Sequence, residues 1–133
     1  MKSMKSLVVD DELVSRSKLQ KIMESFGHCD VVDNGDRAVL AVIMALNSDQ
    51  PYDLILMDIM MPIMDGHEAL QRIRQVEKER GVAPGNEARV LVISSLEDQK
   101  NVCRAFFRGL ASGYLTKPVN KESILKALQE LSF

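Results

Sequence analysis

The segment Tyr52–Gly66 reads YDLILMDIMMPIMDG, and its apolar run Leu54–Met57 ends abruptly at Asp58. A short apolar run without alternation is typical of a strand that is buried on both faces, as in a parallel sheet covered by helices. Pro62 cannot continue a hydrogen-bonded ladder, and Asp65-Gly66 predicts a turn before a helix. Asp58 is therefore expected at the carboxyl end of a buried strand, the place where open α/β sheets bind ligands.

The rest of the chain alternates between short apolar runs and amphipathic stretches. Five strand–helix repeats predict a parallel sheet with right-handed crossovers and helices on both faces. No linker or repeat interrupts the pattern, so residues 1–133 are predicted to form a single α/β domain. Besides the central strand, we expect strands at Met4–Val9, Cys29–Val32, Arg89–Ile93 and Tyr114–Thr116, and helices at Leu13–Phe26, from an Asp36 N-cap to Asn47, at His67–Arg80, Glu97–Leu110 and Glu122–Leu131.

Composition excludes several classes of protein. The net charge of -2 argues against a nucleic-acid footprint, and no apolar run is long enough to span a bilayer. The first residues, MKSMKSLVVDDE, lack the apolar core of a signal peptide. Cys29 and Cys103 have no metal-binding spacing, which favours two reduced thiols in a cytoplasmic protein.

Charged and polar residues follow four of the predicted strands. Asp10 and Asp11 follow the first, Asp58 the third, Ser94 the fourth and Lys117 the fifth. Because parallel strands end at one edge of the sheet, the three carboxylates are expected to meet there and repel one another, which a Mg²⁺ ion would relieve. Mg²⁺-binding acids with a lysine and a hydroxyl opposite indicate a phosphoryl-transfer site. No P-loop is present, so a bound nucleotide is not the expected phosphate source.

Four motifs in this order resemble the receiver domain of bacterial two-component response regulators, especially the chemotaxis regulators. They are VDDE (Val9–Glu12), DIMMPIMDG (Asp58–Gly66), VLVIS (Val90–Ser94) and GYLTKP (Gly113–Pro118), and the resemblance covers essentially the whole chain. It implies a flavodoxin-like, doubly wound sheet with strand order 2-1-3-4-5 and five helices.

The resemblance also assigns the site. Asp58 would be the phosphoacceptor, and Asp11 and Asp58 would ligate Mg²⁺ together with the backbone carbonyl of Met60. Asp10 would act on the ion through a water molecule. Lys117 would bind the phosphoryl group, and the Lys117–Pro118 peptide is expected to be cis.

A switch is implied by the same resemblance. Ser94 would be the switch hydroxyl and Tyr114 the switch aromatic. The phosphoryl donor would be a histidine kinase or a histidine phosphotransfer protein. A downstream protein, or a second copy of the chain, would bind the face formed by Glu97–Leu110, Tyr114–Thr116 and Glu122–Leu131.

The chain departs from the usual family pattern at three places. Ser95 stands where a small Ala or Gly is common, and Leu110 stands where a helix-ending glycine is common, with Gly109 one place earlier. A leucine would be strained in the left-handed conformation of such a cap. Phe106 and Phe107 cannot both face the core, because adjacent helical residues point about 100° apart.

Alternatives accompany these assignments. Asp10-Asp11 could cap a helix, Ser94 could cap the next helix, and Tyr114 could be a partly buried core tyrosine. His28 and His67 are expected at the surface. An aspartyl-phosphate-forming hydrolase or transferase of the haloacid-dehalogenase type would typically carry a second aspartate at the position of Met60. The sequence therefore favours a phosphoacceptor signalling protein over that enzyme, and it lacks the phosphate loop of a flavin carrier.

Overall fold

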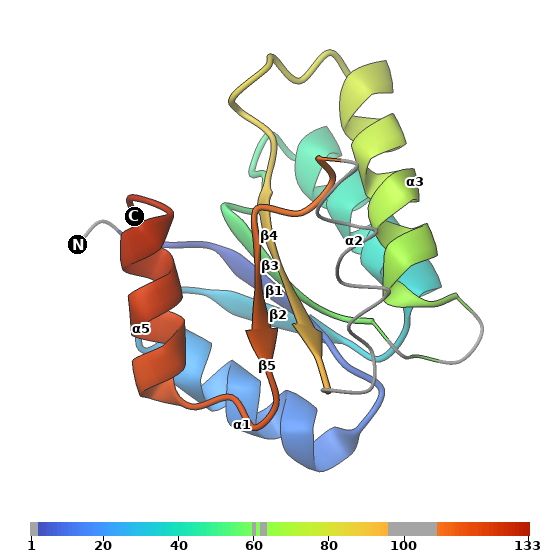
Figure 1. Cartoon of the computed structure of the whole chain (residues 1–133). Coiled ribbons are helices and arrows are strands. Elements are labelled where there is room, and N and C mark those ends of the chain that lie inside the picture. Colours follow the sequence, from blue (N-terminus) through green and yellow to red (C-terminus); the bar gives the residue numbers. More distant parts are fainter. Residues whose placement is uncertain (1–2, 60, 62–63, 96–108) are drawn as a thin grey trace.

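The computed structural model describes residues 3–59, 61, 64–95 and 109–133. Its centre is a five-stranded parallel sheet in the order β2-β1-β3-β4-β5, as the resemblance implied. Helices cover both faces of this sheet (Figure 1). The strands are β1 (Ser6–Val9), β2 (Cys29–Val32), β3 (Leu54–Asp58), β4 (Arg89–Ser94) and β5 (Gly113–Thr116), and the helices are α1 (Leu13–Glu24), α2 (Gly35–Asn47), α3 (Gly66–Glu79) and α5 (Lys121–Glu130).

The described part of the chain thus contains four of the five predicted helices. The remaining one, predicted at Glu97–Leu110, lies outside the described residues except for its last two positions. Phe106 and Phe107 also lie outside them, so the prediction about these rings stays a prediction.

The central strand β3 is buried on both faces, as its sequence predicted. Leu54, Ile55, Leu56 and Met57 have no exposed surface. Ile55 and Met57 pack into the apolar cluster under α2 and α3, whereas Leu54 and Leu56 pack into the cluster on the other face. The alternation of side chains along one strand therefore joins both cores of the domain.

The register of the sheet brings the strand ends together. Val9 pairs with Met57, Asp58 with Ile93 and Ser94 with Thr116. We call this side of the sheet, where the strands end, the carboxyl edge, and the side where they begin the amino edge. The residues that follow Val9 and Thr116 consequently lie beside Asp58 and Ser94.

The start of α2 differs from the prediction. Asn34, and not Asp36, is the N-cap, because the Asn34 side chain accepts a hydrogen bond from the Arg37 backbone N–H at 2.8 Å. Gly35 then enters the helix, where a Cβ atom would lie 2.5 Å from the backbone oxygen of Met64. Close contact with the chain before α3 therefore sets the position of this helix start.

The expected strain at Leu110 is absent. Gly109 adopts the left-handed conformation, with φ of 68°, and Leu110 packs against the cluster under α2 and α3. A glycine one place earlier thus supplies the conformational freedom that the family pattern requires. Arg74 of α3 donates a hydrogen bond from Nε to the Leu110 carbonyl at 3.0 Å, which fixes this loop to the domain.

The predictions for the two histidines and the two cysteines compare differently with the structure. His28 is exposed, as expected, and its Nε2 lies 2.7 Å from Asp30 Oδ1. The prediction for His67 is wrong: its side chain is buried at 7% exposure, because the first turn of α3 packs against the end of β3. Cys29 is a buried free thiol, while Cys103 lies outside the described residues.

Candidate functional site

Three carboxylates meet at the carboxyl edge. Asp10 and Asp11 follow β1, Asp58 ends β3, and one oxygen from each lies within 4.8 Å of the others. Asp10 and Asp58 are buried, with 0% and 3% exposure, whereas Asp11 is exposed. Because like charges at this separation repel, the cluster favours a bound cation. The juxtaposition predicted from the strand ends is present.

Lys117 supplies a cation on one side of the cluster. Its Nζ lies 3.3 Å from Asp58 Oδ2, and its backbone N–H donates to the Ser94 carbonyl at 2.8 Å. Burial alone would lower the pKa of Lys117, but the carboxylates of Asp58 and Asp10 raise it by more, so the pKa lies above its usual value. The ammonium is therefore charged at neutral pH and available to an anionic ligand.

Ser94 contributes a hydroxyl beside Asp58. It ends β4 with no exposed surface, and its Oγ has no hydrogen-bond partner among the described residues. Its chain neighbour Ile93 pairs with Asp58 across the sheet, and the Ile93 carbonyl accepts a hydrogen bond from the Ile59 N–H at 3.1 Å. A buried polar atom without a partner is uncommon and costs stability, so it marks a place where a ligand oxygen could bind.

The backbone beside Asp58 depends on a glycine. The N–H of Gly66 donates to the Ile59 carbonyl at 2.8 Å. A Cβ atom on Gly66 would lie 2.2 Å from the Asp58 carbonyl oxygen, which is too close for any other residue. The Asp65 side chain caps α3 by accepting from the Glu68 N–H at 2.8 Å. The DG dipeptide thus lets the helix start directly against the end of β3.

Tyr114 and Met60 are the other two predicted site residues. Tyr114 is on β5, opposite Val92, and is 48% exposed, so it lies outside the buried core, and its role as the switch aromatic stays a prediction. Met60 lies outside the described residues, so its carbonyl stays a prediction. The Lys117–Pro118 peptide is cis, as expected.

The partners of Asp10 were not predicted from the sequence. Its Oδ1 accepts from the Glu12 N–H at 3.0 Å, and its Oδ2 accepts from the Ser15 hydroxyl at 2.6 Å. Both partners lie at the start of α1. A serine in the first turn of a helix that follows a strand-end aspartate is the signal that could have indicated this contact.

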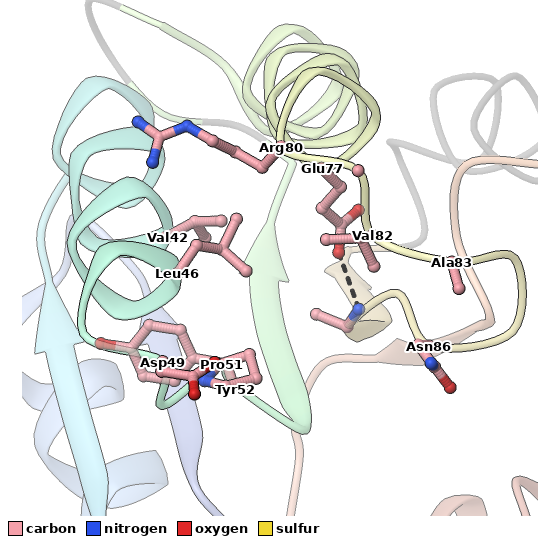
Figure 2. Close-up of a pocket in the computed structure, with 12 residues that line it drawn as sticks. Val42, Leu46, Asp49, Pro51, Tyr52, Glu77, Arg80, Val82, Ala83 and Asn86 are labelled. Atoms are coloured by element: carbon pink, nitrogen blue, oxygen red, sulfur yellow. Dashed lines mark hydrogen bonds between the residues drawn. The ribbon is translucent and has the colours of Figure 1, made fainter.

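The amino edge carries a different hollow, of about 480 Å³. Figure 2 shows Val42 and Leu46 of α2 on one wall and Val82 opposite, with Tyr52 below. Its buried carboxylate, Glu77, accepts from the Ala88 N–H at 2.7 Å. The side chains of Asp58 and Lys117 do not line this hollow, so it is separate from the carboxylate cluster.

Comparison with known proteins identifies the chain's relatives. The response regulator receiver domain matches residues 6–129, which is nearly the whole chain. The chain belongs to the response regulator receiver domain family. As a member of this family, the chain is a phosphorylatable signalling receiver of two-component phosphorelays.

Receiver proteins of similar length are among the relatives. The two-component response regulator ORR41 of Oryza sativa is 34% identical over 123 residues, covering 92% of this chain and 90% of that protein. The chemotaxis protein CheY of Halobacterium salinarum is 32% identical over 125 residues, covering 94% and 93% of the two chains.

Solved receiver structures share the fold. The receiver domain of the histidine kinase CKI1 from Arabidopsis thaliana, complexed with Mg²⁺, has a TM-score of 0.77 at 27% identity, and 96% of this chain and 91% of that one are covered. The receiver domain of Ssk1 from Saccharomyces cerevisiae, in a co-crystal with the phosphotransfer protein Ypd1, has a TM-score of 0.79 at 25% identity, covering 96% and 88%. Among the described residues of this chain, no helix has the length and apolar character needed to cross a membrane.

Proposed function

We propose that Asp58 accepts a phosphoryl group from a histidine kinase or a histidine phosphotransfer protein. In this step the bond between phosphorus and the donor's imidazole nitrogen breaks, and a bond from phosphorus to an Asp58 carboxylate oxygen forms. The observation that carries the proposal is the position of Asp58, buried at a strand end with Asp10 and Asp11 on one side and Lys117 on the other.

The same carboxylates fit a Mg²⁺ ion. Asp11 and Asp58 would hold it directly, with the Met60 carbonyl as a further oxygen ligand, and Asp10 would contact it through water. Their oxygens lie within 4.8 Å of one another, and oxygen donors are what Mg²⁺ prefers. When bound, the ion would neutralise charge on the carboxylates and on the incoming phosphoryl oxygens.

Lys117 and Ser94 would bind two oxygens of the phosphoryl group. Lys117 already approaches Asp58 at 3.3 Å, and the Ser94 hydroxyl is buried with no hydrogen-bond partner among the described residues. A phosphoryl group brings three strong acceptor oxygens and about two negative charges, which suits one ammonium and one hydroxyl donor.

The Ser94 contact would also start the conformational switch. Movement of its hydroxyl toward the phosphoryl group would draw the following segment inward and let Tyr114 change its position. The partner-binding face would then be formed by 97–110, β5 and α5. This face would have two packings, and the charge of the phosphoryl group would favour one of them. A downstream protein, or a second copy of the chain, would bind the favoured packing.

Residues 1–133 would work as one receiver domain in the cytoplasm. The chain would be a signalling phosphoacceptor and not an enzyme with a separate substrate, although it would assist its own phosphorylation and dephosphorylation. The site supports this because Asp58 is itself the nucleophile, and the proposed cation site and phosphoryl-binding groups lie beside it.

Intact-mass measurement tests the proposal. With Mg²⁺ and a small-molecule phosphodonor, the wild-type chain should gain one phosphoryl group, and removal of Mg²⁺ by a chelator should prevent this. Asp58→Asn should remain unmodified. Asp36→Asn, the same change at an exposed aspartate, should behave as the wild type. Full modification of Asp58→Asn would overturn the assignment.

A further inference from the structure

The start of α1 is built differently from that of the other described helices. The N-cap side chains of α2, α3 and α5, which are Asn34, Asp65 and Asn120, each accept a hydrogen bond from their own helix. The N-cap of α1, Glu12, makes no such bond. Asp10, two residues earlier, takes over part of this role, because its Oδ1 accepts from the Glu12 N–H at 3.0 Å.

Ser15 binds the other oxygen of the same carboxylate. Its hydroxyl donates to Asp10 Oδ2 at 2.6 Å, a short distance typical of a hydrogen bond to a charged acceptor. Ser15 is the third residue of α1 and is half-buried. The Asp10 carboxylate therefore has one protein donor on each oxygen before any ion binds.

The backbone of Asp10 is held at both of its polar groups. Its N–H donates to the Val32 carbonyl at 3.2 Å, and its carbonyl accepts from Arg16 Nη1 at 3.0 Å. Main-chain position is thus fixed by β2 and α1 together, independently of Ser15. The remaining freedom of Asp10 is rotation of its carboxylate, which the Glu12 and Ser15 donors restrict.

We propose that Ser15 is a positioning residue of the metal site. Its hydroxyl holds the Asp10 carboxylate in one orientation and occupies a lone pair of Oδ2. In that orientation Asp10 contacts the hydrated Mg²⁺ ion through a water molecule, and Asp11 and Asp58 remain its direct ligands. This inference rests on the proposed function, because it assigns a task to Ser15 within the same Mg²⁺ site.

Mg²⁺ demands near-ideal octahedral geometry, so its affinity is sensitive to the orientation of each contributing oxygen. Residues that orient the groups around a metal are commonly worth 10–100-fold in affinity. Removing the Ser15 hydroxyl would leave Oδ2 of a buried carboxylate without that donor and free the group to rotate. The hydroxyl, and not the bulk of the side chain, is what the inference requires.

Calorimetric titration of the phosphate-free protein with Mg²⁺ tests the inference. Ser15→Ala should weaken Mg²⁺ binding about tenfold, the lower end of the range for residues that orient metal-binding groups. Ser15→Thr keeps a hydroxyl and should restore an affinity within about twofold of the wild type. Ser17→Ala, the same change at an exposed position of α1, should leave the affinity unchanged.

The titration is made where circular dichroism shows every variant to be folded, so a purely structural effect on stability would not change the measured dissociation constant. Wild-type affinity in Ser15→Ala, or tenfold weaker binding in Ser15→Thr as well, would overturn the role of the hydroxyl alone. Wild-type protein that binds Mg²⁺ no better than Asp11→Asn would overturn the proposed metal site and this inference together.

Discussion

Both edges of the sheet bury carboxylates, but the partners of these carboxylates differ between the two edges. At the carboxyl edge, Asp10 and Asp58 lie beside Asp11, with the Lys117 ammonium 3.3 Å from Asp58. At the amino edge, Glu77 is as buried as Asp58, at 4% against 3% exposure. Its Oε1 accepts from Arg74 at 2.6 Å and its Oε2 accepts from the Ala88 N–H at 2.7 Å.

Burial alone therefore does not separate a functional carboxylate from a structural one. The charge of Glu77 is balanced by one guanidinium and one N–H, which ties α3 to the start of β4. At the carboxyl edge, one oxygen from each of three carboxylates lies within 4.8 Å of the others, and the Lys117 ammonium lies 3.3 Å from Asp58. The buried Ser94 hydroxyl has no hydrogen-bond partner among the described residues. The excess of negative charge and the unused donor are the features that favour a cation and a phosphoryl group there.

The largest effect on stability should come from breaking the ion pair between Glu77 and Arg74. Glu77→Ala leaves a partly buried guanidinium and a buried N–H without their acceptor, so the free energy of unfolding should fall by about 3 kcal/mol. Urea denaturation measures this, with Glu79→Ala, an exposed change in the same helix, as the control. Phosphorylation at saturating Mg²⁺ should still occur in Glu77→Ala. A loss of phosphorylation with wild-type stability would reverse the comparison between the two edges.

A smaller effect is expected at the tyrosine of the amino-edge hollow. Tyr52 donates to Asp30 Oδ2 at 2.6 Å, and burial together with this carboxylate raises the pKa of Tyr52 above its usual value of 10.0. Its contribution to stability is then complete below that value and is lost as the pH rises through the folded-state pKa. Tyr52→Phe should cost about 1 kcal/mol at neutral pH, and the cost should diminish above pH 10.

Urea titrations at neutral and alkaline pH check this, and Tyr114→Phe, the change at the other tyrosine, serves as the control. If the difference in stability between Tyr52→Phe and the wild type were the same at both pH values, the Tyr52–Asp30 bond would not have the assigned importance.

The smallest stability effect should occur at the carboxyl edge. Because the Ser94 hydroxyl has no hydrogen-bond partner among the described residues, Ser94→Ala should change the free energy of unfolding by less than about 0.5 kcal/mol. Ser112→Ala is the matched change, since Ser112 Oγ accepts from the Val90 N–H at 3.2 Å, and it should cost about 1 kcal/mol. Equal costs for the two variants would show that Ser94 has a structural partner in the absence of ligand.

Ser94→Ala should instead affect the response to phosphorylation. Beryllofluoride with Mg²⁺ mimics the phosphoryl group, and in the wild type it should shift amide NMR signals over 97–116. In Ser94→Ala the ion should still bind near Asp58, but the shifts along β5 should largely disappear. Shifts of wild-type size in this variant would separate the Ser94 hydroxyl from the switch.

Much of the architecture could be predicted from the sequence. The unbroken apolar run Leu54–Met57 indicated a strand buried on both faces, and five strand–helix repeats indicated a parallel sheet. A parallel sheet places all strand ends at one edge, so the meeting of Asp10, Asp58 and Lys117 followed from topology. Resemblance to receiver domains supplied the strand order, which apolar periodicity does not contain.

Individual polar contacts were harder to predict. The contact between Ser15 and Asp10 depends on where α1 begins, and a helix start is uncertain by several residues in sequence analysis. The burial of His67 follows from the close approach of Gly66 to the end of β3, a packing distance that no residue pattern encodes. The N-cap of α2 was misplaced because Asn34 and Asp36 are both good capping residues.

The position of the phosphoryl group in the wild-type chain tests the central claim most directly. After reaction with a small phosphodonor and Mg²⁺, borohydride reduces an aspartyl phosphate to homoserine, and peptide mass spectrometry locates the altered residue. We expect Asp58 to be altered and Asp10, Asp11 and Glu77 to be intact. Alteration of any of these three residues with Asp58 unchanged would contradict this claim.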